Sequence, residues 1–188
     1  MHGAIGHFRT ITHHRHQVIR HCRKAGILWR GLMHDLSKYT PTEFFEGARF
    51  YVGDKSPNVG ARIENGCSRA WLHHKGRNRH HFEYWTDYDP VSHEIRPVKM
   101  PAIFVAEMFC DRVAASKIYR GKAYNDRHPL EYFLSGKPTR FIHPETSDTL
   151  ERLLRILADE GEDKAFAAVR EMLRLDKNKQ RQKRSEEK

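Results

Sequence analysis

Near its N-terminal end the chain reads Gly31-Leu32-Met33-His34-Asp35-Leu36-Ser37-Lys38. An apolar helical pattern runs directly into a His-Asp doublet, and a lysine follows three residues later. Adjacent side chains on a helix point about 100° apart. Near a helix end, however, one divalent cation can bind both an imidazole nitrogen and a carboxylate oxygen. Because two ligands do not complete a metal site, His34 and Asp35 need partners from elsewhere in the chain.

Histidines of the first predicted helix are one source of such partners. The chain has 14 histidines, of which 11 precede residue 82. Three of them, His7, His14 and His21, are seven residues apart and drift only about 20° per step around a helix. His14 shares the apolar stripe of the helix predicted over residues 5–25 and is the best candidate ligand. The competitors for this role are His7, His13, His16 and His21.

Asp111 lies in the middle of a strongly apolar helix that is predicted from Pro101 to about Arg120. Burying an unpaired carboxylate is costly, so Asp111 requires a cation or a basic partner. A metal ion is one such partner, and an ion pair with an arginine such as Arg112 or Arg9 is the alternative.

A dense group of histidines lies between the doublet and Asp111. His73-His74 and His80-His81 flank a basic loop that contains Asn78. Four imidazoles within nine residues can supply a second metal ion or position water and phosphate. The alternative is a polar, aromatic-rich surface segment.

The periodicity of apolar residues predicts an all-α protein, a helical bundle of about six to eight helices. Thr40-Pro41-Thr42-Glu43 begins one helix with a capping residue, a proline and an acid. The other helices are predicted over residues 5–25, 27–37, 61–74, 101–120, 146–159 and 162–175. Residues 53–60 and 87–97 are predicted to be irregular, without strands. We expect a single domain over residues 1–175, and a basic, disordered tail over residues 176–188.

The composition limits the classes of partner and location. The net charge of +10 comes from 34 Lys+Arg against 24 Asp+Glu, which favours phosphorylated small molecules or nucleotides, or nucleic acid, as partners. Cys22, Cys67 and Cys110 are an odd number without a CxxC pair, which argues against a disulfide framework or a zinc knuckle. No apolar run reaches the roughly 20 residues of a membrane span, and the N-terminus lacks a signal-peptide core. We therefore expect a cytoplasmic protein without membrane contact, of open oligomeric state.

The order of these groups resembles the HD-domain metal-dependent phosphohydrolase superfamily. A histidine on the first helix, the doublet after an apolar run, later histidines and an aspartate on a late helix follow one another over about residues 7–120. The resemblance implies an all-α, HD-domain-like fold. It also implies the metal ligands His14, His34, Asp35 and Asp111. The stretches 70–78 and 83–85 also look like those of an uncharacterised bacterial family.

The resemblance further implies a hydrolase that uses metal-activated water on a phosphate ester of the nucleotide or phosphodiester class. The ions expected at such a mixed site are Mn, Fe, Mg or Zn, one or two of them, with His73 and His74 as ligands of the second. Lys38 would face the substrate phosphate, and Glu43 would act as a general base or support a metal-bound histidine. The residues expected to neutralise phosphate charge are Lys75, Arg77 and Arg79.

Two other functions compete with the hydrolase. The residues His73-His74, Asn78 and His80-His81 have the types needed for a nuclease of the His-Asn-His kind, although that motif normally uses two strands and a helix. A helical nucleic-acid-binding module without enzymatic activity is the second alternative. It would use the basic tail and would stack bases on Trp71, Tyr84 and Trp85.

Overall fold

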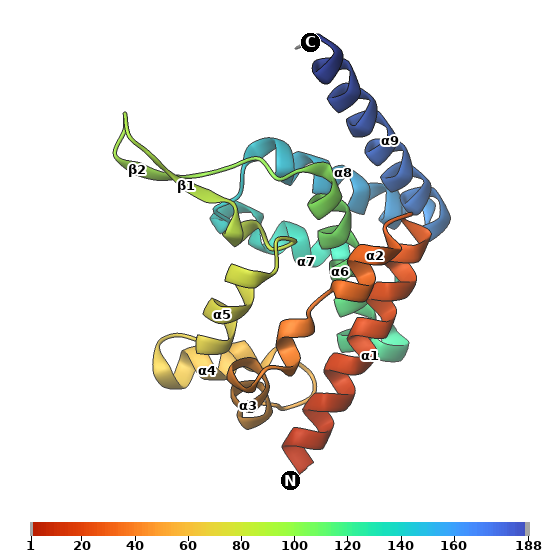
Figure 1. Ribbon diagram of the computed structural model, residues 1–188. Coiled ribbons are helices and arrows are strands. Elements are labelled where there is room, and N and C mark those ends of the chain that lie inside the picture. The colour runs from red at the N-terminus through yellow and green to blue at the C-terminus, as the bar shows by residue number, and fades with distance from the viewer. Residues whose placement is uncertain (1, 187–188) are drawn as a thin grey trace.

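The computed structural model describes residues 2–186, and this part of the chain is predominantly helical (Figure 1). Its α-helices are α1 (His2–Lys24), α2 (Leu28–Met33), α3 (Pro41–Arg49), α4 (Pro57–Asn65), α5 (Arg69–Arg77), α6 (Ala102–Arg120), α7 (His128–Gly136), α8 (Pro144–Glu160) and α9 (Glu162–Glu186). Short 3-10 helices are η1 (Leu36–Tyr39), η2 (Phe82–Tyr84), η3 (Gly121–Ala123) and η4 (Lys137–Thr139). The predicted all-α helical bundle is confirmed.

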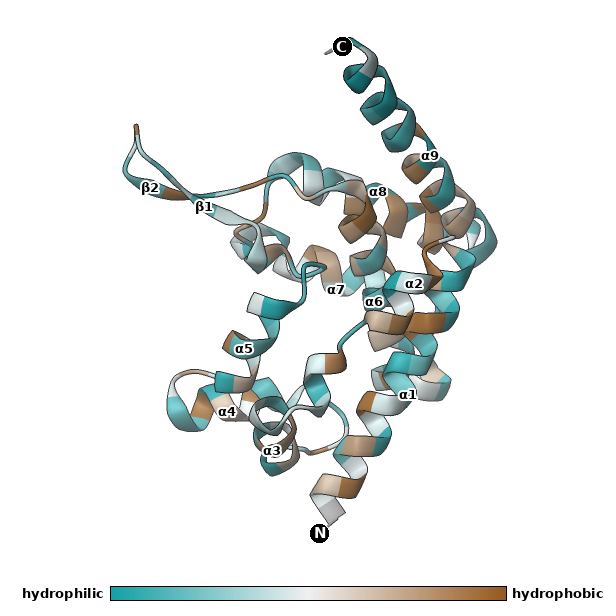
Figure 2. Ribbon diagram, viewed as in Figure 1, coloured by the Kyte–Doolittle hydropathy of each residue, from teal (hydrophilic) through white to brown (hydrophobic). Residues whose placement is uncertain are grey.

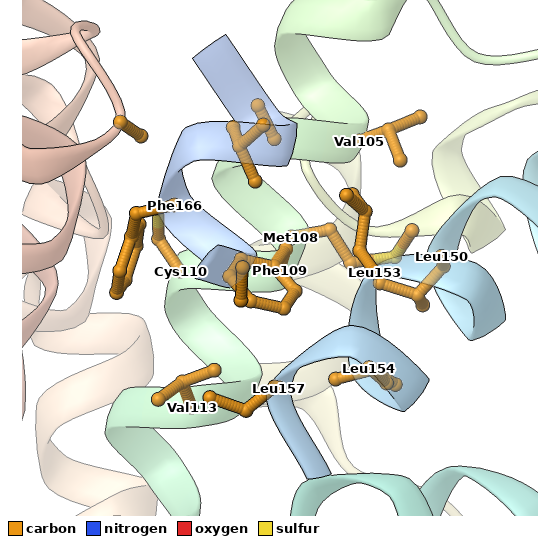
Figure 3. Packing of buried hydrophobic residues seen from close by; sticks show 14 of the residues in the cluster. Val105, Met108, Phe109, Cys110, Val113, Leu150, Leu153, Leu154, Leu157 and Phe166 are labelled. Carbon is orange, nitrogen blue, oxygen red and sulfur yellow. The ribbon is translucent and has the colours of Figure 1, made fainter. Parts of the chain in front are cut away.

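The hydrophobic core is built around α6, which packs against α1, α7, α8 and α9. Figure 3 shows side chains of α6, α8 and α9 meeting in this core, among them Phe109 and Phe166. Helix α8 contributes leucines at the i, i+3, i+4 and i+7 spacing that places them on one face; these are Leu150, Leu153, Leu154 and Leu157. Cys22 and Cys110 are fully buried in the same cluster, and neither forms a disulfide.

Helices α3, α4 and α5 contribute almost nothing to this core. No residue between positions 28 and 81 of the described chain belongs to the buried hydrophobic cluster. The buried side chains of this region are mainly polar, and they include Glu43, Ser68, His74, Asn78 and His80. Because apolar burial is the main driving force for folding, this region depends more than the rest on its polar contacts.

Gly31 allows α2 to pack closely against α1. A methyl group at Gly31 would lie 2.7 Å from Cβ of Cys22 and 3.1 Å from Cα of Ile19. Both distances are below ordinary van der Waals contact, so a larger side chain would push the two helices apart. The close approach also fixes the turn that follows α2, where His34 lies.

We therefore expect Gly31→Ala to lower the free energy of unfolding by about 1–3 kcal/mol, the usual cost of overpacking. The measurement is chemical denaturation of the two proteins. Gly76→Ala on α5 is the matched control, because nothing lies within 4 Å of its added methyl group. Alanine is the better helix former, so this control should match or exceed the wild type. An equal fall in the free energy of unfolding in both variants would show that the close contact between α1 and α2 is not the cause.

The helix predicted over residues 27–37 is interrupted at the doublet. Helix α2 ends at Met33, and Asp35 adopts a left-handed conformation with φ of 53° and ψ of 26° before η1 begins. Aspartate tolerates this conformation better than most residues, although at some cost. Apolar spacing continues through Leu36 and therefore concealed the break.

The helix predicted over residues 61–74 is in fact two helices. Helix α4 already begins at Pro57, and Gly66 ends it in a left-handed conformation. Ser68 then caps α5, because its hydroxyl accepts a hydrogen bond from the amide of Trp71. The cap explains the new start, since serine at this position satisfies a free amide of the first turn.

Two further segments differ from the sequence prediction. Residues 87–97, predicted to be irregular, belong to an antiparallel hairpin of β1 (Thr86–Asp89) and β2 (Glu94–Pro97), with Thr86 opposite Pro97. The hairpin projects from the helical body in Figure 1, and most of its strand residues are exposed. An exposed strand pair lacks the apolar alternation on which strand prediction depends. Helix α7, absent from the prediction, begins with a proline at its first turn.

The basic tail is helical in the described chain. Helix α9 continues through residues 176–186, where a disordered segment was expected, and residues 187–188 lie outside the described part. The distal half of α9 extends from the body and is hydrophilic (Figures 1 and 2). Lysine, arginine, glutamine and glutamate are good helix formers even without apolar periodicity. None of the described helices has the length and apolar character needed to cross a membrane.

Candidate metal centre

The interface between the hydrophobic core and the α3–α5 region contains a buried cluster of imidazoles and carboxylates. The cluster is centred on Asp35, whose side chain is 2% exposed. Helix α1 contributes His14, α6 contributes Asp111, and the turn after α2 contributes His34. The remaining histidines come from α5 and from the loop that follows it; they are His74, His80 and His81.

The first group of potential metal ligands consists of His14, His34, Asp35 and Asp111. Nε2 of His14 lies 2.9 Å from Oδ1 of Asp111. Nε2 of His34 lies 3.3 Å from Oδ2 of Asp35 and 3.5 Å from Oδ1 of Asp111. These are the four residues that the resemblance implied as ligands of the first ion, and the fold brings all four together.

The second group consists of Asp35, His74, His80 and His81. Oδ1 of Asp35 lies 3.3 Å from Nε2 of His74 and 3.5 Å from Nε2 of His80. Nε2 of His74 and Nε2 of His81 are 2.9 Å apart. Nitrogen ligands at about 2.0–2.1 Å from one ion lie roughly 3 Å from each other. The spacing within this group is therefore that of ligands around a common centre.

Asp35 belongs to both groups and presents a different oxygen to each. Neither oxygen accepts a hydrogen bond, although the Lys38 ammonium lies 2.7 Å from Oδ2. Nε2 of His14, of His34 and of His80 is also buried without a hydrogen-bond partner. Buried polar atoms in folded proteins nearly always have partners. So many unsatisfied ligand atoms facing one another fit a site that holds a cation.

Glu107 of α6 orients the histidines from the side remote from Asp35. Its Oε1 accepts a hydrogen bond from Nδ1 of His34 at 3.0 Å and lies 3.4 Å from Nδ1 of His80. Arg30 holds the other oxygen at 2.6 Å. A proton on Nδ1 leaves the lone pair of Nε2 free to bind an ion, and carboxylates commonly fix metal-binding histidines in this way. Glu107, His34 and His80 also qualify geometrically as a third ligand group, but the Arg30 contact and this hydrogen bond favour an orienting role.

Glu43 of α3 has the corresponding role in the second group. Its two oxygens lie 2.7 Å from Nδ1 of His73 and 2.7 Å from Nδ1 of His74. The Glu43 side chain is 4% exposed. Of the two roles expected for Glu43, this geometry matches the support of a metal-bound histidine.

We expect Glu43→Gln to weaken metal affinity by about 10- to 100-fold, because such orienting carboxylates have effects of that size. Isothermal titration calorimetry with Mn²⁺ measures the affinity of each protein for the ion. Glu46→Gln tests a neighbouring glutamate that binds Ser68 rather than a histidine. The role of Glu43 is refuted if both variants retain wild-type affinity.

The charge states of the histidines differ. Burial lowers the pKa of His14 and His80, and it lowers that of His81 well below its usual value. For His74, burial lowers the pKa, but Asp35 and Glu43 raise it above the usual value overall. The imidazoles of His14, His80 and His81 are therefore neutral near pH 7, and each has a lone pair available, as metal binding requires.

Among the α1 histidines whose side chains the structure describes, His14 alone reaches the centre. His13 and His16 are exposed. His7 is buried beside Phe44 and Tyr51 instead. His21 is also buried, and its Nδ1 lies 3.2 Å from the backbone oxygen of Cys110. The seven-residue spacing thus predicted the buried face correctly, and the tertiary structure selects His14.

The structure does not place all predicted site residues at the centre. His73 belongs to none of the ligand groups in the described chain and binds Glu43 instead. Lys75, Arg77 and Arg79 do not line the cavities beside the cluster. The side chain of Arg77 contacts the backbone oxygen of His73, and that of Arg79 lies over Tyr84. Lys38, by contrast, lines the adjacent cavity.

The sequence left the roles of His80 and His81 open and gave Glu107 none. All three are part of the cluster. The signal for Glu107 was present, because it lies four residues before Asp111 on the same apolar helix, where a buried carboxylate requires a partner. His80 and His81 follow α5 in a loop, where no periodicity indicates the direction of a side chain.

The fold and the site together define a class: an all-α protein with a buried histidine–carboxylate centre able to hold metal. A family model described as a family of unknown function, DUF5662, matches residues 3–156, and the chain belongs to this family. The matched region contains every residue of the cluster. Comparison with curated proteins found no match, and comparison with solved structures likewise found none.

Proposed function

We propose that this protein is a divalent-metal-dependent phosphohydrolase, in which Asp35 would belong to the ligand sets of two ions. The observation that carries the proposal is the buried Asp35 carboxylate, which faces a different ligand group with each oxygen and pairs with Lys38 through one of them. The mixed imidazole and carboxylate ligands suit Mn, Fe, Mg or Zn. The order and placement of His14, His34, Asp35 and Asp111 agree with the resemblance to the HD-domain superfamily.

Divalent ions at such a centre lower the pKa of bound water and polarise a phosphoryl oxygen. The chain itself supplies orientation and charge. Glu43 and Glu107 hold the histidine protons on Nδ1 and so direct Nε2 toward the centre. Lys38 lines the cavity above the cluster and carries the positive charge suited to a substrate phosphate. Asp35 raises the pKa of Lys38 against the effect of burial, which keeps it protonated.

The competing functions have weaker support. In the nuclease alternative the histidines would lie on a strand pair, but His74, His80 and His81 all precede the hairpin and surround Asp35 instead. In the binding-module alternative the aromatic residues would present free faces. Trp71, however, packs edge-on against His81, and Trp85 packs against Phe104 beside the core.

The test combines metal content with turnover. Purified protein is expected to contain up to two equivalents of Mn, Fe or Zn, or to take up Mn²⁺ in that ratio. The loaded protein should hydrolyse p-nitrophenyl phosphate or bis(p-nitrophenyl) phosphate. His80→Ala should lose one equivalent and most turnover, whereas His93→Ala in the exposed hairpin should lose neither. A wild type that binds no metal after Mn²⁺ addition, or that binds metal and hydrolyses no phosphate ester, overturns the proposal.

A further inference from the structure

A second cavity opens beside the metal centre, between the start of α4 and the helices α6 and α7. It measures about 720 Å³, within the range of cavities that bind small molecules. Asp111 and His81 of the metal cluster line it, so the cavity continues directly from the site. A substrate with its reactive phosphate at the centre would therefore have its remaining part in this cavity.

Two arginines, Arg112 and Arg140, line this cavity and lie over one phenylalanine ring. The guanidinium carbon of Arg112 on α6 lies 5.9 Å from the ring centre of Phe133, and that of Arg140 lies 4.9 Å from the same ring. Phe133 is fully buried. Arg140 is partly engaged, because it donates to the backbone oxygen of Phe133 at 2.7 Å.

Arg112 makes no comparable hydrogen bond within the described chain. Its Nε is buried and has no hydrogen-bond partner, and no carboxylate of the described chain lies within ion-pairing distance of its guanidinium. The Arg112 side chain is half-buried, and a cation withdrawn from water without a partner is costly. The guanidinium offers a planar fork of donors that matches a phosphate or a carboxylate. Arg112 thus has the features of a residue whose partner is a ligand.

The surrounding charges favour an anion. The carboxylates that line this cavity are Asp54, Glu83 and Asp111, and Asp111 belongs to the metal cluster. The cationic side chains are more numerous; they are Lys55, Arg62, Arg112, Arg120 and Arg140. Glu83 carries one negative charge near Arg112 and Arg140, whose two positive charges outweigh it.

We propose that Arg112, supported by Arg140, binds a second anionic group of the substrate. Given the proposed function, on which this inference rests, the substrate class is a phosphate ester that carries a further phosphate or carboxylate away from the bond that is cleaved. Asp111 and Arg112 are consecutive on α6, so one helix turn presents both the metal ligand and the anion-binding residue. The distance between the two groups of the substrate is thereby set by a rigid element.

The test uses a matched pair of probes, adenosine 3′,5′-bisphosphate and adenosine 5′-monophosphate, which differ by one phosphate. Binding is measured by calorimetry in the Mn²⁺-loaded protein that keeps Asp35, and the probes are recovered afterwards so that any hydrolysis is corrected for. The bisphosphate is expected to bind at least about tenfold more tightly, as a charged hydrogen-bonded pair provides. Arg112→Gln should remove this preference. Arg127→Gln is the control, because Arg127 is exposed and pairs with Asp159.

The outcomes separate this inference from the proposed function. Hydrolysis by the wild type with equal binding of both probes would overturn the anion subsite and leave the phosphohydrolase intact. A preference that depends on Arg112 without any hydrolysis by the wild type would establish the subsite and refute the phosphohydrolase. If Arg112→Gln does not fold, Arg112→Lys keeps the charge without the fork, and an undiminished preference in it would overturn the role of the guanidinium.

Discussion

Replacement of Asp35 by asparagine is expected to remove both metal ions and to lower phosphate-ester turnover by at least about 1,000-fold. The loss corresponds to about 4 kcal/mol of transition-state stabilisation. The physical reason is that each oxygen of Asp35 faces a separate ligand group. An amide has a similar shape but lacks the negative charge, and its nitrogen cannot bind a cation. Elemental analysis and phosphate release, measured on the same preparation, give both quantities.

The pattern among the other ligands makes the Asp35 prediction specific. His14→Ala should remove mainly the ion of the first group, and His80→Ala mainly that of the second. Only the Asp35 variant should remove both. Asp159→Asn, at a side chain that is 59% exposed, should retain metal and turnover. Full metal content in Asp35→Asn would refute the proposal that both ligand groups depend on the Asp35 carboxylate.

Removal of metal from the wild type is expected to have the second large effect, on stability. A ligand that binds only the folded state at 1,000 times its dissociation constant stabilises by about 4 kcal/mol. For a chain of 188 residues this amounts to a fall in Tm of about 10 °C on complete removal. Differential scanning calorimetry before and after chelation, and again after Mn²⁺ is restored, measures the change.

The loss of thermal stability should begin in the α3–α5 region. Residues 28–81 contribute nothing to the hydrophobic cluster, while His34, Asp35 and His74 connect this region to α1 and α6 through the centre. Without the ions Nε2 of His34 and Nε2 of His80 remain buried without a hydrogen-bond partner, so the α3–α5 region should open first. Hydrogen exchange should therefore quicken in α3–α5 more than in α6 and α8. Uniform exchange across all helices, or an unchanged Tm, would contradict this account.

The cluster also suggests why so polar a region folds against the core. Asp35 adopts a left-handed conformation, which an isolated peptide would rarely hold. Lys38 and His74 contact its carboxylate, and α5 packs near η1. The turn and the α5 helix thus hold each other in place through Asp35. A metal ion would add to an arrangement that the side chains already make.

Sequence by itself determined the helical class, the long helices and five of the metal-ligand candidates, His74 among them. Helices α1, α6 and α8 follow from apolar spacing, because a helix that packs on a core needs an apolar stripe. His14 and Asp111 stood out as polar residues on such stripes, and His34-Asp35 as a doublet. These inferences are local, since each depends on the period of one helix.

Tertiary structure alone decided which residues share the site. His80 and His81 lie in a loop and join Asp35 only because α5 folds back beside η1, whereas His73 on α5 turns toward Glu43. Likewise, Arg112 lines the cavity beside the centre, whereas Lys75 and Arg77 at the end of α5, and Arg79 after it, do not. Spacing along a chain indicates the face of a helix, but not which faces meet. Contacts between segments far apart in sequence depend on the packing of the whole fold.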